Sequence, residues 1–256
     1  MVERVQLRVT GDDFGRSAEV NRAFSSDWQS GFLTQASLMP GAPAAKEALQ
    51  IAGNHPAQVG LHLTLCDGLA LTDCPLADTD RQLPASASRV GWQIWARRGD
   101  ADFMQGLRDE IEAQFAWVRE QWPDAHHWDG HHHLHLHPVI FPIAAHFAAR
   151  YRFNRVRLLL KPERVRMVSM ILSSLSRTAR GQATRSGQRF DDWVFGLAQT
   201  GQMTDEKVFH LLRQIERLPP ANQVELYYHP GAEPSALKEN FGAWAREAFP
   251  AIQWAR

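Results

Sequence analysis

Residues 5–31 read "VQLRVTGDDFGRSAEVNRAFSSDWQSG" and combine a strand, a polar junction and a helix. Apolar and polar residues alternate over 5–10, which is the period of a β-strand. A helix is expected over 17–31, because Ser17 stands where a cap is needed and Gly31 where the helix would end. A strand followed by a helix is the unit from which parallel sheets are built.

The same order of strand and helix recurs along the chain. Further strands are predicted at 33–38, 59–65, through a histidine-rich stretch that ends before Pro138, and at 155–160, 193–197 and 224–230. Further helices are predicted at 43–53, 103–122, 138–151, 163–181, 204–217 and 234–248. Seven such units without a repeat or a linker predict an α/β fold. We expect a distorted (β/α) barrel of about seven parallel strands, similar to a TIM barrel, as one domain over 1–256.

Two segments depart from this order. Residues 67–100 are rich in Asp, Thr, Pro and Ser and are long for a connection without regular structure, so an irregular excursion near the ligand site is expected. The Arg-, Ser- and Gly-rich stretch 177–189 is expected to be a mobile, solvated loop.

Composition limits the functional classes. The 256 residues carry 28 Lys and Arg against 28 Asp and Glu, so no net charge favours nucleic acid as a partner. No apolar run reaches the roughly eighteen residues of a membrane-spanning helix. The charged start of the chain does not resemble a secretory signal, and Cys66 and Cys74 are too few for a disulfide framework. These features predict a cytoplasmic protein with a small-molecule partner, and they leave a homodimer open.

A histidine run stands out at residues 129–138, which read "DGHHHLHLHP" and hold five of the twelve histidines in seven positions. In an extended chain, alternate histidines from His131 to His137 would share one face, and His132 would point away. An imidazole that binds a metal must be neutral and held in orientation by a second group. Asp129 is near enough in sequence to serve as that group.

Polar residues also fall at the ends of other predicted strands. "GDDFG" (11–15) ends the first strand, His62 lies late in the third, and His229 in "YYHPG" ends the seventh. Because the carboxyl ends of parallel strands meet on one face, these groups should line one mouth. Asp12 and Asp13 point to opposite faces of an extended chain, so one can bind a metal while the other reaches the water that the metal activates.

The motifs "GDDFG", "GLHLTL", "DGHHHLHLHP" and "HPG" together resemble the YdjC/ChbG family of carbohydrate deacetylases from residue 5 to about 232. The usual family pattern is "ADDFG" and "DSHHHVH", so Gly11 and Gly130 stand where the family has Ala and Ser. Neither change removes a ligand. The motif "GHHHLHLHP" also resembles that of the hopanoid-biosynthesis branch of the family, HpnK.

The resemblance implies a metal-dependent hydrolase that removes the N-acetyl group from an acetylated amino sugar and releases acetate. The substrate would be chitooligosaccharide-like or an N-acetylglucosaminyl lipid such as a hopanoid. The resemblance also implies one divalent ion, Mg²⁺ or Zn²⁺, bound by Asp13, His62 and His131. Asp12 matches the general base, and His229 stands where a histidine would act as general acid.

Substrate contacts are expected from two further residues. His133 would support His131 or touch the substrate, and Arg157 would hold a sugar hydroxyl. His126 and His127 begin the predicted strand and are expected to be structural.

Two alternatives remain. Another metal-dependent hydrolase, of the phosphoesterase or amidohydrolase type, usually has His-x-His after its first strand, where this chain has Asp12 and Asp13. A non-enzymatic metal-binding protein would need only the histidine run and would leave Asp12, His62 and His229 unexplained.

Overall fold

The computed structural model describes residues 4–54, 58–161, 167–199, 202–220, 222–231 and 241–255. The strands are β1 (Val5–Phe14), β2 (Gln35–Leu38), β3 (Gln58–Leu63), β4 (His127–Gly130), β5 (Arg155–Val156), β6 (Trp193–Phe195), β7 (Gln223–Tyr228) and β8 (Ile252–Trp254). The α-helices are α1 (Ala18–Gln29), α2 (Ala45–Ala52), α3 (Ala87–Ala96), α4 (Ala101–Gln121), α5 (Ile140–Arg150), α6 (Met167–Arg185), α7 (Asp205–Ile215) and α8 (Phe241–Ala248). Two short 3-10 segments, η1 (His131–Leu136) and η2 (Leu197–Gln199), complete the set.

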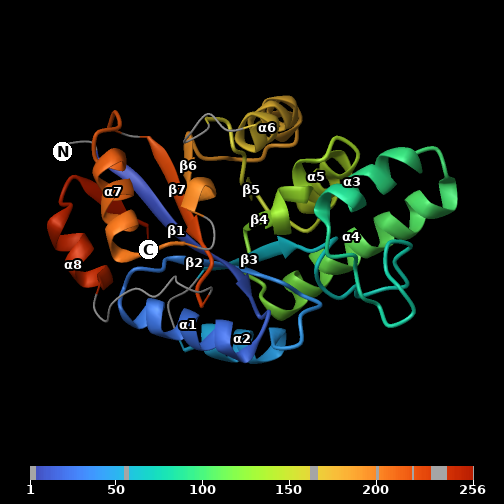
Figure 1. The fold of residues 1–256 in the computed structure, drawn as a ribbon, viewed down its shortest axis with the longest axis horizontal. Helices are drawn as coiled ribbons and strands as arrows, with labels where there is room; N and C mark the ends of the chain where they lie inside the picture. The colour runs from blue at the N-terminus through green and yellow to red at the C-terminus, as the bar shows by residue number, and fades with distance from the viewer. Residues whose placement is uncertain are drawn as a thin grey trace.

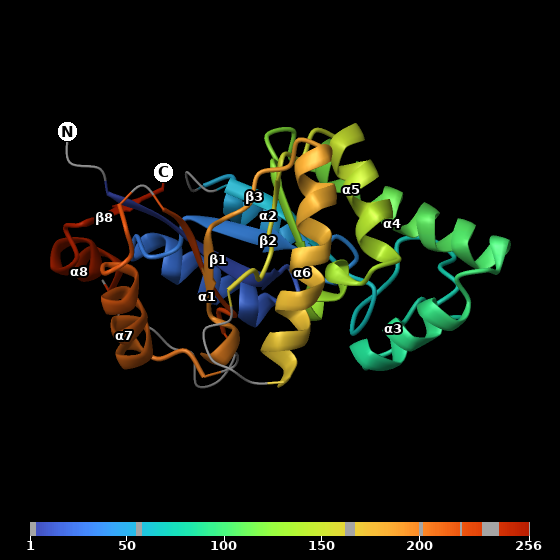
Figure 2. The same cartoon turned by 90° about the horizontal axis from the view of Figure 1, so that it is seen from above.

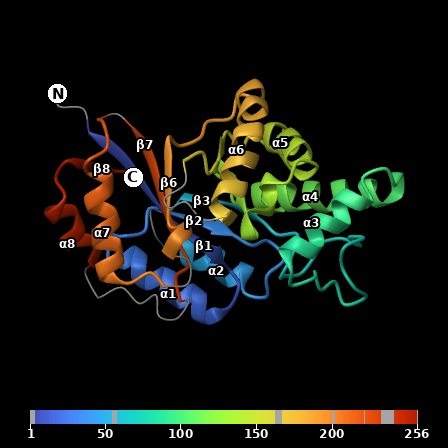
Figure 3. The same cartoon turned by 45° about the horizontal axis from the view of Figure 1, so that its top comes forward.

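All strand pairs are parallel, in the order β5-β4-β3-β2-β1-β7-β6, and β8 pairs with the start of β1. In the described part of the chain β5 and β6 are the two ends of this order, and only a single parallel bridge, between Arg155 and Arg189, extends the pairing beyond β5, so the strands form a half-barrel. Helix α6 connects these edges and lies beside them (Figures 1 and 3). The prediction of a parallel, barrel-like α/β fold is confirmed.

Apolar periodicity explains how the helices are held on the sheet. Phe103, Leu107, Ile111 and Phe115 recur along α4 and are all buried, because four-residue spacing places them on one side of a helix. Asp100 caps this helix, since its side chain accepts a hydrogen bond from the Phe103 N–H.

Within the described ranges, none of the helices has both the length and the apolar character needed to cross a bilayer.

Some elements differ from the sequence prediction. The stretch 177–189 is helical in α6 as far as Arg185, rather than a loop, because the small side chains of Ala179 and Ala183 are buried against the core. Residues 163–166 of the predicted helix, and 234–240 of the last one, lie outside the described residues. The final strand β8 was not predicted, and its three residues are held by pairing with β1 and by burial of Ile252 and Trp254 in the core.

The excursion at 67–100 contains more structure than expected. It holds an antiparallel bridge between Leu69 and Gln82, and the helix α3, which Ser86 caps. The buried carboxylate of Glu110 on α4 accepts the N–H groups of Leu71 and Thr72 and so fixes the excursion to the body. Helix α3 and the beginning of α4 project from the rest of the molecule (Figures 1 and 2).

One buried carboxyl on α1 gives a stability prediction. Burial raises the pKa of Asp27 from the usual 3.8 to about 6, although the Tyr228 hydroxyl donates to its Oδ2 at 2.7 Å. Because the folded state holds the proton more tightly than the unfolded chain, Asp27 lowers stability progressively as the pH rises from about 4 to 6. Asp27→Asn is expected to raise the free energy of unfolding by up to about 3 kcal/mol above pH 6.

Denaturant titrations between pH 4 and 7 measure this effect. Below pH 4 the variant and the wild type should converge, because Asp27 is protonated in both states. Equal stability of the two proteins across the whole range would show that Asp27 carries no such cost.

Candidate metal-binding active site

The carboxyl ends of the central strands place the candidate residues around one pocket. Its volume is about 510 Å³, and it opens beside the ends of β1, β3, β4 and β7. Six of the seven residues predicted from the sequence line it: Asp12, Asp13, His62, His131, His133 and His229. Polar groups from separate strands therefore lie at one mouth, in agreement with the expectation from the sequence.

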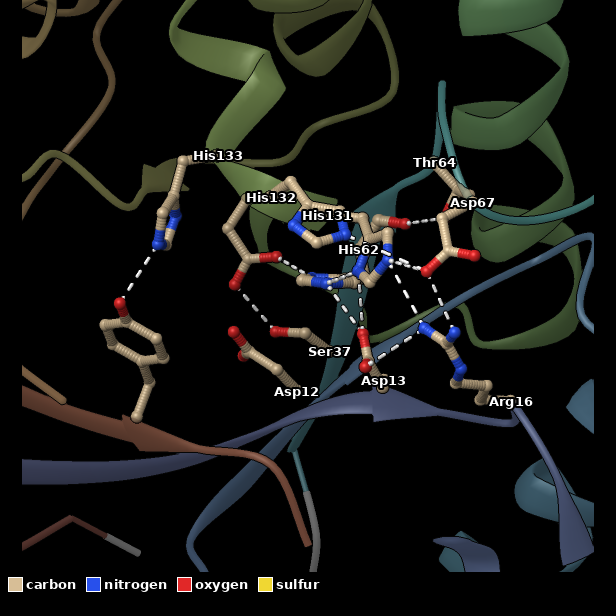
Figure 4. A network of polar contacts seen from close by, with 12 residues as sticks. Asp12, Asp13, Arg16, Ser37, His62, Thr64, Asp67, His131, His132 and His133 are labelled. Atoms are coloured by element: carbon tan, nitrogen blue, oxygen red, sulfur yellow. Dashed lines mark hydrogen bonds and ion pairs between the residues drawn. The ribbon is translucent and has the colours of Figure 1, made fainter. Parts of the chain in front are cut away.

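Asp13, His62 and His131 converge on one point (Figure 4). Asp13 Oδ1 lies 2.8 Å from His131 Nδ1 and 3.3 Å from His62 Nε2, and the two nitrogens are 3.3 Å apart. Ligand atoms around a tetrahedral ion with bonds of about 2.1 Å lie about 3.4 Å from one another. Asp13 Oδ1 is buried, and no described residue satisfies it with a well-formed hydrogen bond. The three side chains thus suit a single divalent ion.

The two neighbouring aspartates take different directions, as the sequence predicted. Asp13 has a left-handed backbone, with φ of 67°, at an irregularity in the pairing of β1 with β2. Its carboxylate reaches the histidines, whereas that of Asp12 forms two hydrogen bonds to Arg157, of 2.7 and 2.8 Å. This backbone turn lets adjacent carboxylates serve separate functions at one pocket wall.

The histidine run is not the strand that its alternation predicted. β4 ends at Gly130, and residues 131–136 form 3-10 turns in which His132 and His133 have φ of 52° and 56°. Alternate histidines therefore do not share a face. His131 faces Asp13, His133 Nε2 lies 2.9 Å from the Tyr227 hydroxyl, and His135 is bonded to the backbone away from the pocket.

Gly130 makes this turn possible. A Cβ at Gly130 would lie 2.8 Å from Cβ of His135, closer than side chains tolerate. Gly11 is under a similar constraint, because a Cβ there would lie 2.4 Å from the ring of Phe24. Packing thus explains both positions at which this chain departs from the usual family motif.

Asp129 orients a different histidine from the one expected. Its Oδ1 lies 2.6 Å from His62 Nδ1, so His62 presents Nε2 to the candidate ion site. Oδ2 of Asp129 accepts from the Ser37 hydroxyl at 2.8 Å and lies 2.8 Å from Arg157 Nη2. The expectation that Asp129 holds a histidine of the run is therefore wrong, and the histidine that this buried carboxylate holds is His62.

Arg157 is the centre of a buried charge cluster. Its guanidinium bonds Asp12, Asp129 and Glu225, and only 1% of its side chain is exposed. It does not line the pocket and lies behind Asp12, so this position suits the orientation of Asp12 better than the predicted contact with a sugar hydroxyl. One cation among three carboxylates leaves an excess of negative charge.

Burial and the charges of this cluster shift several pKa values. Burial raises the pKa of Asp12, and Arg157 offsets only part of that effect. For Asp129, burial is outweighed by Arg157 and His62, which hold its pKa well below the ordinary value. Burial also opposes the charged form of His62, but the carboxylates of Asp129 and Asp12 prevail and raise its pKa to about 10. The site attracts positive charge, as a cation-binding site should.

The remaining predicted residues lie at the pocket wall. His133 is partly buried, and desolvation together with the charge of Arg157 holds its pKa well below the usual value, so its imidazole is neutral. The Nδ1 atoms of His133 and His229 are both buried, and neither has a hydrogen-bond partner within the described ranges.

Two site residues were not predicted from the sequence. Arg16 Nη2 pairs with Asp67 Oδ2 at 2.9 Å, and Arg16 Nη1 lies 3.3 Å from His131 Nε2 (Figure 4). Asp67 belongs to the excursion, which thus reaches the site as expected. The only signal for Arg16 was its position directly after "GDDFG".

The fold and the site together define a class: a parallel β/α half-barrel with an Asp-His-His cluster at the carboxyl ends of its strands. Residues 6–249 match the family described as YdjC-like protein. The chain belongs to this family, as its motifs predicted.

Curated relatives carry deacetylase names. The chain is 36% identical over 146 residues to the "Carbohydrate deacetylase" of Geobacillus stearothermophilus, which covers 56% of each protein. It is 29% identical over 248 residues to the mouse "Carbohydrate deacetylase", covering 89% of this chain and 78% of that one. A "Chitooligosaccharide deacetylase" of Salmonella dublin is 33% identical over 58% of this chain and 57% of its own length. The chain thus spans about half the length of these bacterial relatives.

Solved structures share the fold. A crystal structure from Enterococcus faecalis superposes with a TM-score of 0.71 at 16% identity, over 99% of this chain and 97% of that one. The lactam utilization protein of Thermus thermophilus superposes with a TM-score of 0.52 at 13% identity, over 99% of both chains. At such identities the likeness concerns the fold alone.

Proposed function

We propose that this chain is a metal-dependent hydrolase that removes the N-acetyl group from an acetylated amino sugar. The observation that carries the proposal is the convergence of Asp13, His62 and His131 at 2.8 to 3.3 Å, beside a second carboxylate that lines the same pocket. The deacetylase names of the relatives support the choice of reaction.

One divalent ion, Mg²⁺ or Zn²⁺, would be held by Asp13, His62 and His131. Bound there, it would lower the pKa of a water molecule and polarise the acetamide carbonyl. Ligands of mixed oxygen and nitrogen type accept either metal. Asp129 keeps Nε2 of His62 directed at the ion through the 2.6 Å contact with Nδ1.

Asp12 is the group that takes the proton from the attacking water. Its carboxylate lies at the pocket wall next to the ligand Asp13, and its raised pKa makes it a stronger base than an ordinary aspartate. As the C–N bond of the acetamide breaks, the departing nitrogen needs a proton. His229 lines the pocket and gives that proton, which leaves acetate and a free amine.

The substrate would be chitooligosaccharide-like or an N-acetylglucosaminyl lipid such as a hopanoid, since both present the same acetamide. The pocket suits a molecule that has both a polar and an apolar part. Its lining combines the Asp and His residues with the apolar side chains of Val168, Leu172 and Leu197. His133 lines the same pocket and would touch the sugar.

The proposal is tested with purified protein, N-acetylglucosamine oligomers and an N-acetylglucosaminyl lipid. Acetate and free amine are measured together. We expect equal amounts of the two products from at least one substrate, and the preferred compound identifies the substrate class. If neither product forms from either compound while the protein holds its ion, the deacetylase proposal fails.

Metal affinity should rise with pH. Without the ion, the pKa of His62 is raised to about 10, so at neutral pH a proton must leave before Nε2 can bind a metal. The dissociation constant for Zn²⁺ is expected to fall about tenfold per pH unit between pH 6 and 9. Titration calorimetry in buffers of different ionisation enthalpy should show about one proton released per ion.

The control for this prediction is Asp129→Asn. Removing the carboxylate that contributes most to the raised pKa should flatten the pH dependence. An affinity that does not change with pH in the wild type would contradict the assigned protonation of His62.

A further inference from the structure

Helix α6 reverses the distribution of polar and apolar residues that an ordinary surface helix shows. The residues that it buries are small, and three of the five are polar: Ser169, Ser173, Ser176, Ala179 and Ala183. The residues that its first turns leave exposed are large and apolar: Met167 (77% exposed), Val168 (59%), Met170 (55%) and Ile171 (52%). A helix packed on a core normally shows the reverse pattern.

The inner face of α6 is fixed in this orientation. The hydroxyl of Ser176 accepts the Leu159 N–H at 2.9 Å, just beyond β5. This hydrogen bond therefore holds the large apolar side chains of α6 on its exposed side. Among the described residues, seven large hydrophobic side chains are exposed, and four of them lie in this one stretch.

The exposed face continues as a basic surface. Arg177 and Arg185 are exposed, and α6 contains no Asp or Glu. Arg177 follows Met170 by seven residues, and Arg185 follows Ile171 by fourteen, so each lies on the same side of the helix as its apolar counterpart. A helix face that joins apolar side chains to arginines is complementary to a bilayer surface with anionic headgroups.

The same face borders the candidate active site. Val168 is exposed and also lines the pocket, as does Leu172 one turn later. Helix α6 lies at the top of the molecule in Figure 1 and toward the viewer in Figure 2, where its long side is open. A surface that contacts the first turns of α6 would therefore lie beside the pocket.

We propose that α6 is an interfacial helix that docks this chain on an anionic lipid bilayer. Met167, Val168, Met170 and Ile171 would enter the boundary between headgroups and acyl chains, while Arg177 and Arg185 pair with lipid phosphates. This inference concerns a surface and goes beyond the proposed reaction. Docking would direct the pocket toward substrates at the lipid surface.

The experiment is co-sedimentation of the full chain with vesicles of phosphatidylcholine, alone or mixed with phosphatidylglycerol. The variants are M170S/I171S, which removes apolar contact, and R177Q/R185Q, which removes charge. The control W92S removes a side chain that is 71% exposed on α3 instead. All positions are exposed, so the variants should fold, and melting temperatures check this.

The wild type is expected to bind the mixed vesicles and to bind neutral vesicles much less. Each double variant should lower the partition coefficient at least about tenfold, and W92S should change it less than about twofold. Activity on a soluble oligomer should be retained in M170S/I171S, since neither residue lines the pocket. Vesicle binding needs no catalysis, so it can fail or hold independently of the proposed function.

Three results would overturn the proposal. The wild type could stay in the supernatant with both kinds of vesicle. W92S could lose as much binding as M170S/I171S, which would indicate unspecific adhesion. Light scattering could show a wild-type dimer that M170S/I171S dissociates, with no vesicle binding, and the occupant of this face would then be a second copy of the chain.

Discussion

Replacing His62 with alanine is expected to abolish tight binding of the divalent ion and, with it, acetate release. His62 supplies one of three ligand atoms, and Asp129 holds it in orientation at 2.6 Å. Loss of an outer hydrogen-bond partner alone costs a metal site about 10–100-fold in affinity, so loss of the ligand should cost more. Equilibrium dialysis with Zn²⁺ and an acetate assay on the same preparation measure both effects.

The control is His137→Ala, which removes a histidine of the same run that does not line the pocket. It should leave one tightly bound ion and near wild-type activity. A protein that takes up several ions, and does so equally well without His62, would be a metal sink rather than a hydrolase. That result would contradict the assigned ligand set.

Asp12→Asn is expected to lower kcat by about 10²–10⁴-fold while the bound ion is retained. The amide keeps the shape of the carboxylate and an oxygen for Arg157, but it cannot accept the proton of the attacking water. Asp13 and the histidines are unchanged, so metal affinity should stay within about tenfold of the wild type. Turnover and metal titration together separate loss of the base from loss of the ion.

Glu225→Gln is the matched control for this substitution. Glu225 binds the same guanidinium, at 2.8 and 3.0 Å, but does not line the pocket. Both variants remove one of the three carboxylates around Arg157, so the change in buried charge is alike. If E225Q lowered kcat as far as D12N, the role of Asp12 would be structural.

Much of the site could be predicted because its residues follow local rules. A strand that ends in "GDDFG", and histidines near the ends of other strands, place side chains on the face where the carboxyl ends of parallel strands meet. This reasoning directed the polar groups to one mouth, and the resemblance to the deacetylase family then selected Asp13, His62 and His131 among them as the metal ligands. It also gave the two aspartates separate directions, because adjacent residues of an extended chain point apart.

The errors arose where distant contacts decide local structure. The histidine run alternates like a strand, but His132 and His133 take left-handed backbones, and Gly130 accommodates His135. Arg157 resembled a surface or substrate residue within "RVRLLL", and only the fold brings Asp12 and Glu225 to it from other strands. Pairing between residues so far apart in sequence leaves no local pattern.

The structure of helix α6 also depends on contacts with distant residues. Its Arg-, Ser- and Gly-rich end predicts a loop, because these residues favour solvent. Burial of Ala179 and Ala183 on one side keeps it helical to Arg185. The periodicity of this segment could be identified only once its small residues were known to be the buried ones.

The most direct measurement of the central claim is acetate release before chelation, after chelation and after return of one equivalent of Mg²⁺ or Zn²⁺. The bound ion is counted at each stage by elemental analysis. The site formed by Asp13, His62 and His131 predicts that activity is lost with the ion and restored with about one ion per chain. Full activity in protein shown to be free of metal would contradict the account.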